Sequence, residues 1–241
     1  MKNYILITGA SSGIGRETAI MLSKNYSLIL NGRDIERLNE TKNLCNNSNE
    51  SILWQYDLSD VKHINENLST LINEKNISIS GFVHSAGVSH LSPLHLTLQT
   101  VIDEVMNVNF FSAVEILKLL LNKKLNAKFL TDVIFVSSIS SCRGAKGMSI
   151  YSASKGALDS FARSMAYELA PKVRVNTVQP GGIPTRRGGG SGFIQSDTTG
   201  YLLGEGHVND VASMIEFILS ERARWITGQN FVVDGGKISH C

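Results

Sequence analysis

A buried strand, a glycine-rich turn and a helix follow one another at the start of the chain. The apolar run at residues 4–7 is too short for a signal peptide and is typical of a buried strand. It leads into Thr-Gly-Ala-Ser-Ser-Gly-Ile-Gly at 8–15, after which apolar residues follow at helical spacing through Leu22. Glycines let the backbone approach a pyrophosphate closely, and the N–H groups at a helix N-terminus attract its negative charge. With a strand and a helix flanking it, this turn predicts a dinucleotide-binding unit.

Strands and helices are expected to alternate along the rest of the chain, which indicates an α/β fold. Its 241 residues, 42% of them hydrophobic, suit one such domain. Asp34 is expected to cap the first helix after the second strand. We expect strands at 27–31, 51–56, 81–83, 132–136, 173–178 and 228–233, and helices at 35–44, 60–72, 101–121, 152–169 and 208–219.

Tyr151 and Lys155 are separated by one helical turn. Apolar residues at helical spacing over 153–169 place both side chains on one helix face. An isolated phenol ionises only near pH ~10, and a neighbouring ammonium favours the phenolate form. Such a pair suits general acid and base catalysis. Taken alone, the spacing favours an interfacial tyrosine beside a solvated lysine, and only the rest of the sequence overturns that interpretation.

Together, the Gly-x-x-x-Gly-x-Gly turn and the Tyr-x-x-x-Lys pair resemble the motifs of the short-chain dehydrogenase/reductase family. The resemblance spans nearly the whole chain and includes the closing motif Asp-Gly-Gly at 234–236. It implies a doubly wound parallel sheet, the Rossmann fold, in three αβα layers. It also implies a single domain over residues 1–241 that carries both the cofactor site and the catalytic site.

The resemblance assigns a catalytic role to several residues. Tyr151 would give or take the proton of the substrate oxygen, and Ser138 would polarise the substrate carbonyl. Lys155 would bind the nicotinamide ribose and bias Tyr151, while Asn109 would distort its helix and hold a water that relays protons to Lys155. The simpler readings are that Ser138 belongs to an ordinary serine-rich loop at 137–141 and that Asn109 is an exposed helix residue.

The resemblance also implies a cofactor site built from several turns. An acidic residue at the end of the second strand would bind the adenosine ribose, but Gly32 lies at that place. Arg33 follows it, and a planar guanidinium suits a phosphate. We therefore expect NADP(H), with NAD(H) possible, unless Arg33 pairs with Asp34 or Glu36 on the surface. The expected cofactor-binding residues are Gly9, Ser11, Ser12, Gly13, Ile14, Gly15, Arg33, Asp57, Leu58, Ala86, Gly87, Tyr151, Lys155, Pro180, Gly181, Ile183 and Thr185; Asp57 could equally cap a turn.

Two segments need separate interpretation. The family usually has Asn-Asn-Ala-Gly after the fourth strand, whereas this chain has His-Ser-Ala-Gly at 84–87. We interpret His84 as structural and satisfied by backbone partners. Residues from about 184 to 207 are expected to form a mobile substrate lid. Within it, Arg186 and Arg187 would bind either an anionic substrate or a cofactor phosphate.

The leading functional hypothesis is an NADP(H)-dependent oxidoreductase that interconverts a carbonyl and a secondary alcohol. A 3-oxoacyl group on an acyl carrier protein is one expected substrate, and a sugar or small ketone is the alternative. A catalytically inactive nucleotide-binding scaffold or sensor, and a nucleotide-sugar or methyl-donor domain, are further alternatives. The presence of Ser138, Tyr151 and Lys155 together disfavours both.

Composition limits the partners and the location. A formal net charge of +2 without a face-wide basic cluster gives no reason to expect a nucleic-acid partner. The cysteines, Cys45, Cys142 and Cys241, are far apart, which favours neither a disulfide framework nor a zinc site and suggests a reducing cytoplasm. No membrane partner and no metal are expected. The apolar surfaces of helices 101–121 and 152–169 predict a homo-oligomer, either a dimer or a tetramer.

Overall fold

A computed structural model describes residues 3–46, 50–126, 130–185 and 200–240. The strands are β1 Asn3–Thr8, β2 Ser27–Gly32, β3 Ile52–Gln55, β4 Ser78–His84, β5 Asp132–Val136, β6 Arg174–Pro180 and β7 Asn230–Val233. The α-helices are α1 Gly13–Leu22, α2 Ile35–Leu44, α3 Ile64–Lys75, α4 Gln99–Met106, α5 Ser112–Leu120, α6 Lys123–Asn126, α7 Ser149–Leu169 and α8 Val208–Leu219. A π-helical segment, Asn107–Phe111, joins α4 to α5, and short 3-10 turns include Ile139–Ser141.

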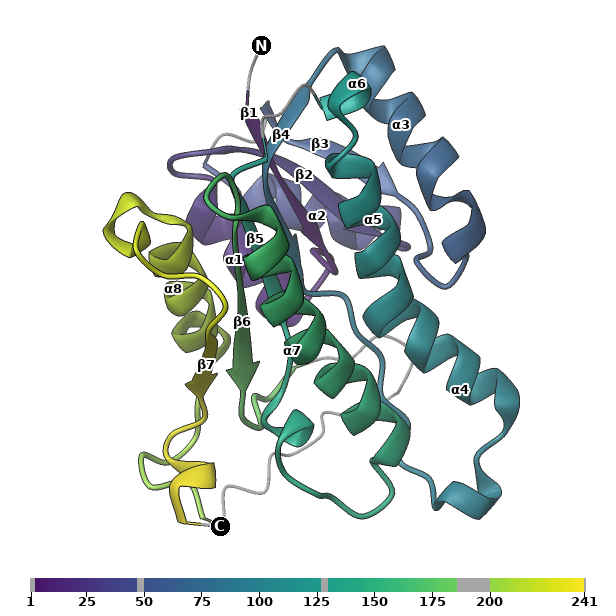
Figure 1. Cartoon of the computed structure of the whole chain (residues 1–241), viewed down its shortest axis with the longest axis vertical. Coiled ribbons are helices and arrows are strands. Elements are labelled where there is room, and N and C mark those ends of the chain that lie inside the picture. The colour runs from purple at the N-terminus through teal and green to yellow at the C-terminus, as the bar shows by residue number, and fades with distance from the viewer. Residues whose placement is uncertain (1–2, 47–49, 127–129, 186–199, 241) are drawn as a thin grey trace.

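The strands form one seven-stranded parallel sheet in the order β3-β2-β1-β4-β5-β6-β7 (Figure 1). In parallel sheets both faces are covered by helices, so strands are apolar on both sides. In β1, Ile5 and Ile7 face one core, whereas Tyr4 and Leu6 face the other. The doubly wound α/β fold expected from the sequence is thereby confirmed.

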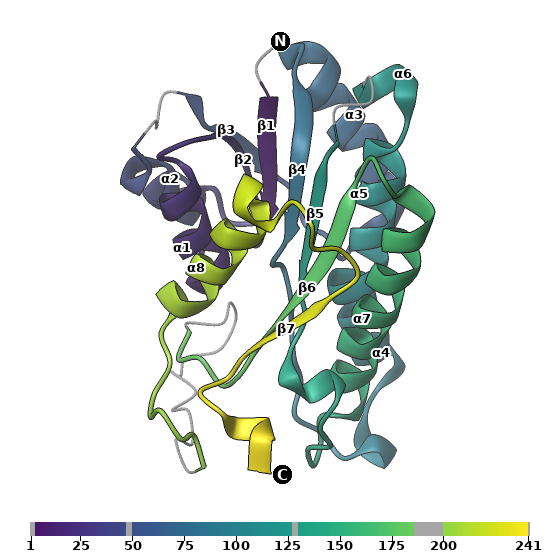
Figure 2. The same ribbon diagram turned by 60° about the vertical axis from the view of Figure 1, so that its left-hand side comes forward.

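Two helical layers enclose the sheet (Figure 2). Helices α1, α2 and α8 cover one face and share a core that includes Leu22, Leu38 and Ile215. Helices α3, α5 and α7 cover the other face, with Leu68, Ile116 and Leu158 in its core. The strand order reverses between β1 and β4, and ligands bind at such a point beyond the carboxyl ends of the strands.

Three helices differ from their expected form. Helix α3 begins at Ile64, after a 3-10 turn at Val61–His63, whereas its expected start was at 60. Helix α7 begins at Ser149, before the expected start at 152, so Tyr151 lies in its first turn. The residue before it, Met148, makes no side-chain cap, so no capping signal marks this start. The expected continuous helix over 101–121 is interrupted by the π-helical segment, which hydropathy alone does not reveal. Among the residues that the structure describes, no helix has the length and apolarity needed to span a bilayer.

Candidate active site

The glycine turn after β1 is packed so closely that side chains cannot replace its hydrogens. A Cβ at Gly9 would lie 2.8 Å from the backbone of Ala86, and one at Gly15 would lie 2.3 Å from the Gly9 carbonyl. Gly9 and Gly13 both have positive φ, which L-residues rarely adopt. The turn is held from outside by the Thr41 hydroxyl, which donates to the Ala10 carbonyl at 2.8 Å. Its backbone therefore forms the wall of the crevice, as close approach of a pyrophosphate requires.

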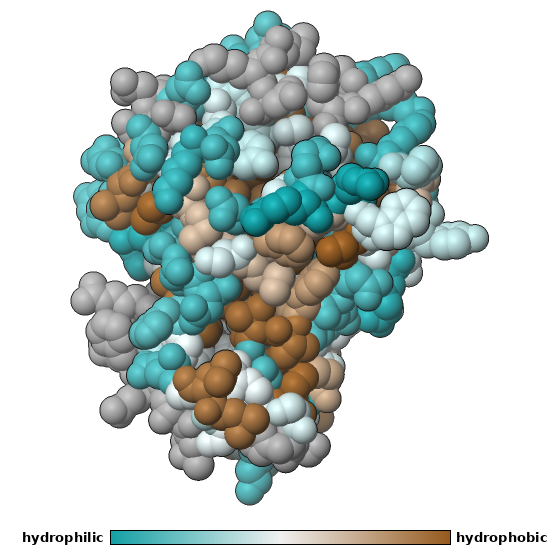
Figure 3. Space-filling model, turned by 90° about the vertical axis from the view of Figure 1, so that its left-hand side faces the viewer, coloured by the Kyte–Doolittle hydropathy of each residue, from teal (hydrophilic) through white to brown (hydrophobic). Residues whose placement is uncertain are grey.

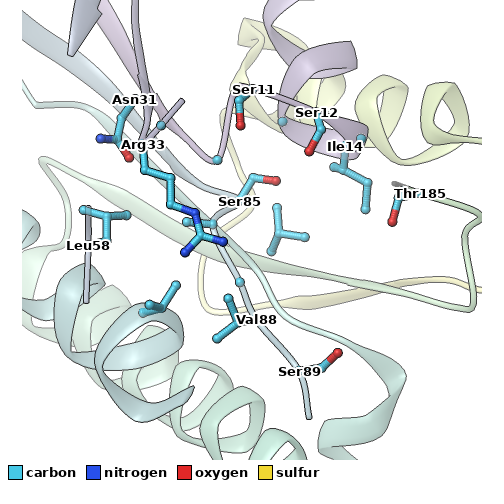
Figure 4. Close-up of a pocket in the computed structure, with 18 of the residues that line it drawn as sticks. Ser11, Ser12, Ile14, Asn31, Arg33, Leu58, Ser85, Val88, Ser89 and Thr185 are labelled. Carbon is cyan, nitrogen blue, oxygen red and sulfur yellow. The ribbon is translucent and has the colours of Figure 1, made fainter. Parts of the chain in front are cut away.

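The end of β2 and the first turn of α2 each carry an arginine that lines the same crevice. Asp34 caps α2 by accepting from the Arg37 N–H at 3.1 Å, as expected. In the described part of the chain, Arg33 forms no ion pair with Asp34 or Glu36. Its side chain extends into the pocket on the same side as Leu58 (Figure 4). Arg37, one helical turn further on, also lines the cavity.

His84 at the end of β4 lies inside the sheet. Its Nδ1 is 2.9 Å from the Thr8 hydroxyl, which also accepts from the Ala86 N–H at 3.2 Å. Burial, and secondarily the positive charge of Lys155, lowers the His84 pKa to about 3. The ring is thus neutral at ordinary pH. Besides the Thr8 hydroxyl, the backbone groups of Asn109 and Val108 interact with the ring, as the sequence suggested.

Asn109 is fully buried in the π-helical segment, so it is not an exposed helix residue. Its Oδ1 accepts from the Val88 N–H at 2.8 Å, and its Nδ2 donates to the Val88 carbonyl at 3.0 Å. The same Nδ2 donates to the Ser154 hydroxyl at 2.9 Å. Asn109 therefore connects the turn after β4 to α7, directly beside Lys155.

Ser138, Tyr151 and Lys155 face one cavity from two elements. Lys155 is 3% exposed, its Nζ lies 5.8 Å from the centre of the Tyr151 ring, and it donates to the Val136 carbonyl at 2.8 Å. These contacts exclude a solvated lysine. Ser138 follows β5, and its Oγ accepts from the Ser140 N–H at 3.1 Å.

The Pro-Gly turn after β6 closes the other end of the cavity. A Cβ at Gly13 would lie 3.1 Å from Cγ2 of Thr185, so this turn and the glycine turn lie against each other. Gly182 donates its N–H to the Tyr201 hydroxyl at 2.6 Å. Ile14 and Thr185 lie together at one side of the pocket, away from Leu58 (Figure 4). Two turns from opposite halves of the chain thus bracket one elongated site.

Together these elements enclose a cavity of about 710 Å³. Every cofactor-binding residue expected from the sequence lines it, as do Ser138, Tyr151 and Lys155, whereas Asn109 lies behind its wall. The close-packed glycines and the arginines at one end fit an extended, phosphate-bearing ligand such as a dinucleotide.

Comparison with known proteins agrees with this geometry. Residues 9–237 match the family described as Enoyl-(Acyl carrier protein) reductase. The chain is 31% identical to the 3-oxoacyl-[acyl-carrier-protein] reductase FabG of Rickettsia prowazekii (97% of this chain, 95% of the relative) and 29% identical to the L-xylulose reductase of Caenorhabditis elegans (96% and 94%). The chain belongs to the short-chain dehydrogenase/reductase family.

Solved structures support this assignment. A 4-hydroxyisoleucine dehydrogenase complexed with NADH superimposes with a TM-score of 0.83 at 26% identity, over 98% of this chain and 99% of the other. ElxO with NADP bound superimposes with a TM-score of 0.85 at 26% identity, over 99% and 100%. The protein is a short-chain dehydrogenase/reductase enzyme, and the scaffold alternative is no longer needed.

Some residues at this dehydrogenase/reductase site were not anticipated. Arg37 lies in the first turn of α2 and lines the cavity, although the motif at the end of β2 does not include it. Asp57 does cap a turn, since its Oδ1 accepts from the Ser59 N–H at 2.9 Å, and it also lines the cavity. The further lining residues that the sequence did not single out are Asn31, Tyr56, Val88, Ser89, His90, Glu104, Val108, Val136 and Ser137.

The substrate lid expected over 184–207 stays a prediction. Residues 186–199, with Arg186 and Arg187, lie outside the described residues. The described residues after them dock on the C-terminal turn: Leu203 donates its N–H to the Gly235 carbonyl at 3.2 Å, and Lys237 Nζ lies 4.9 Å from the centre of the Tyr201 ring.

Proposed function

We propose that this enzyme interconverts a carbonyl and a secondary alcohol and prefers NADP(H), with NAD(H) also usable. The observation that carries the proposal is the convergence of Ser138, Tyr151 and Lys155 on the cavity that the glycine turn and the arginines also line. A proton donor, a hydrogen-bonding hydroxyl and a buried cation in one site are what carbonyl reduction needs.

The residues divide the chemistry between them. When bound along the cavity, a nicotinamide cofactor supplies or accepts the hydride. Tyr151 gives its phenolic proton to the carbonyl oxygen in reduction and takes it back in oxidation. Ser138 binds the same oxygen, because its Oγ already accepts from Ser140 and keeps its own hydrogen for another acceptor.

Lys155 and Asn109 support the proton transfer. The Lys155 ammonium lies beside the Tyr151 ring and is placed to hold the nicotinamide ribose. Asn109 fixes the position of the turn at Val88 against Ser154 and shapes the π-helical segment. We include in the proposal that this segment holds a water that relays protons to Lys155.

The NADP(H) preference rests on Arg33 with Arg37 beside it. No acid stands at Gly32, where a Cβ would come within 3.2 Å of Ser11 and Leu38. A charged hydrogen bond to phosphate contributes roughly 1.5–3 kcal/mol, so Arg33→Ala should raise the KM for NADPH about 10- to 100-fold and leave the KM for NADH almost unchanged. Steady-state kinetics with both cofactors checks this, with Arg222→Ala as the control. Equal losses for the two cofactors would contradict the assignment.

Two substrate classes are proposed. A 3-oxoacyl group on an acyl carrier protein is supported by the FabG relative. A sugar or small ketone is supported by the L-xylulose reductase relative and by the polar side chains Ser89, His90 and Glu104 in the cavity wall, where His90 Nε2 and Glu104 Oε2 are 3.0 Å apart. A panel of 3-oxoacyl thioesters and ketoses assayed with NADPH separates them by kcat/KM.

The proposal extends to assembly and location. We propose a homo-oligomer, either a dimer or a tetramer, that works in the cytoplasm on a small-molecule substrate. The widely separated cysteines support the location. Apolar side chains gather on the face that carries α8 and β7 (Figure 3), and Val232 of β7 is 40% exposed. Together with the exposed aromatic residues of the opposite layer, this surface supports assembly.

Tyr151→Phe tests the proposed chemistry most directly. Removing the phenolic hydroxyl deletes the proton donor, so NADPH-dependent reduction should fall by at least about 100-fold. NADPH binding, measured by fluorescence titration, should be nearly unchanged because the ring remains. Tyr167→Phe, an exposed tyrosine on the same helix, is the matched control. Turnover near that of the wild type in Tyr151→Phe would refute the assignment.

A further inference from the structure

A buried carboxylate below the catalytic pair has no role in the mechanism above. Asp159 follows Tyr151 and Lys155 at successive i+4 positions on α7, so all of them share one helix face. It is 5% exposed, and its Oδ2 accepts from Gln179 Nε2 at 2.7 Å. Its Oδ1 has no hydrogen-bond partner among the described residues. Burying a carboxylate is costly, so this position calls for a physical reason.

Gln179 connects Asp159 to the 3-10 turn Ile139–Ser141. Its Nε2 also donates to the Ser141 hydroxyl at 2.9 Å, so both amide hydrogens are used. Gln179 is 4% exposed and lies on β6 immediately before Pro180. A buried chain of hydrogen bonds thus runs from Asp159 through Gln179 to Ser141, the last residue of the 3-10 turn Ile139–Ser141.

This 3-10 turn determines where Ser138 lies. The Ser138 Oγ accepts from the Ser140 N–H at 3.1 Å, and the Ser141 N–H donates to the Ser138 carbonyl at 3.0 Å. On its other side, the Ser137 hydroxyl donates to the Lys155 carbonyl at 3.1 Å. Ser138 is therefore held between two connections to α7, the helix that carries Tyr151 and Lys155.

The connections differ in kind. The one at Ser137 ends on a backbone carbonyl, which any residue at 155 supplies. The one at Ser141 depends on the side chains of Gln179 and Asp159. Because Gln179 donates to both Asp159 and Ser141, the second connection is lost when either the Gln179 amide or the acceptor at 159 is removed.

We propose that Asp159 and Gln179 are positioning residues for the carbonyl chemistry, holding the Ser138 hydroxyl at its distance from Tyr151. The inference rests on the proposed function, since it concerns the residue proposed to bind the substrate oxygen. Neither residue touches substrate. Both act through Ser141 and the 3-10 turn.

Leucine substitutions remove the hydrogen bonds, since leucine is branched like aspartate and close in volume to glutamine but has no polar atom. Asp159→Leu and Gln179→Leu should lower kcat by about 10- to 100-fold, because small misplacements of a reacting group cost rates of this order. The KM for the carbonyl substrate and the NADPH dissociation constant should change less than about 3-fold. Asp159→Asn keeps an oxygen that accepts from Gln179, so it should retain most of the activity.

Two further variants separate positioning from a general loss of structure. Ser164→Ala, on the exposed side of the same helix, should behave as the wild type. Ser141→Ala removes the acceptor at the other end of the chain of hydrogen bonds. Combined with Gln179→Leu, it should cause no further loss of kcat, since both changes break the same contact. Fully multiplicative losses would overturn the proposal.

The experiment also distinguishes failure of this inference from failure of the proposed function. Ser138→Ala is assayed beside the leucine variants, and hydrogen exchange of segment 137–143 is followed by mass spectrometry. Inactive Ser138→Ala with unchanged kcat in Asp159→Leu and Gln179→Leu would overturn the positioning role alone. Fully active Ser138→Ala would overturn the proposed role of Ser138. Hydrogen exchange in 137–143 then tests the connection from Asp159 through Gln179 to Ser141. Faster exchange in Asp159→Leu than in the wild type supports this connection, and unchanged exchange overturns it.

Discussion

At the scale of single residues, the burial of His84 in the sheet makes the stability of the fold sensitive to acid. Its folded pKa of about 3 lies below the ordinary value of 6.5, chiefly because of burial. Below pH 6.5 the unfolded chain binds a proton at His84 that the folded protein does not bind until about pH 3. The contribution of His84 to the free energy of unfolding is therefore full above pH 6.5 and is lost as the pH falls toward 3. Through this group, the free energy of unfolding changes by up to about 1.4 kcal/mol per pH unit. Urea unfolding from pH 7 to pH 4 should show a smaller loss in His84→Asn.

The control for this prediction is His95→Asn, at an exposed position in the turn before α4. It should keep the pH dependence of the wild type. A parallel loss of stability in wild type and His84→Asn over the whole range would show that carboxylates alone account for acid unfolding.

Sequence patterns predict residues whose chemistry is local, and they fail for contacts that only folding creates. Tyr151 and Lys155 are one helical turn apart, so their proximity follows from helix geometry. Gln179 and Asp159 are 20 residues apart and meet because β6 packs beside α7. No periodicity encodes that contact. Likewise, the burial of Asn109 depends on the turn at Val88, which is distant in sequence.

At the scale of elements, the turn between β1 and α1 allows a sharp test. A Cβ at Gly15 would overlap the Gly9 carbonyl at 2.3 Å, so Gly15→Ala must displace the turn. Overpacking of this kind costs about 1–3 kcal/mol. The variant should lose that much unfolding free energy in urea and bind NADPH more weakly by calorimetry. Gly144→Ala is the matched control, because a Cβ there meets nothing within 4 Å. Unchanged NADPH affinity in Gly15→Ala would contradict the role given to this turn.

Hydrophobic periodicity does not reveal local irregularities within helices or where the helices begin. The apolar spacing over 101–121 predicts helix correctly but cannot tell an i+4 turn from an i+5 turn. The π-helical segment arises where Asn109 bonds to Val88 and Ser154 instead of facing solvent. The early start of α7 has a similar origin, since Ser149 begins the helix without a capping side chain and tertiary packing determines the boundary.

At the scale of the whole molecule, the site exists only because the sheet order brings distant turns together. The cavity wall combines residues that lie at or beyond the ends of β1, β2, β3, β4, β5 and β6. Alternating strands and helices predict a parallel sheet, but the order of its strands follows from the family resemblance rather than from hydropathy. The half of the site at the glycine turn was therefore predictable from local sequence, whereas its closure against Thr185 was expected only from the family resemblance.

Exposed aromatic side chains on the surface predict that the protein self-associates. On the layer opposite α8, Tyr167 of α7 is 92% exposed and Phe111 is 45% exposed. Their helices are joined through the edge-to-face contact of Phe110 with Phe161, 5.8 Å between ring centres, so the exposed rings belong to adjoining helices. Exposed aromatic surface of this kind is typical of self-association. We expect sedimentation of the wild type at a multiple of the 26.3 kDa chain mass.

Tyr167→Glu places a charge in this surface and should shift sedimentation toward a smaller species, because a buried unpaired carboxylate opposes association. Leu44→Glu, on α2 in the other helical layer and 56% exposed in the wild type, provides the matched control and should leave the mass unchanged. A wild type that sediments as a single chain would contradict the predicted assembly. A Tyr167→Glu variant with the wild-type mass would instead locate the interface elsewhere, with the exposed edge at β7 as the next surface to test.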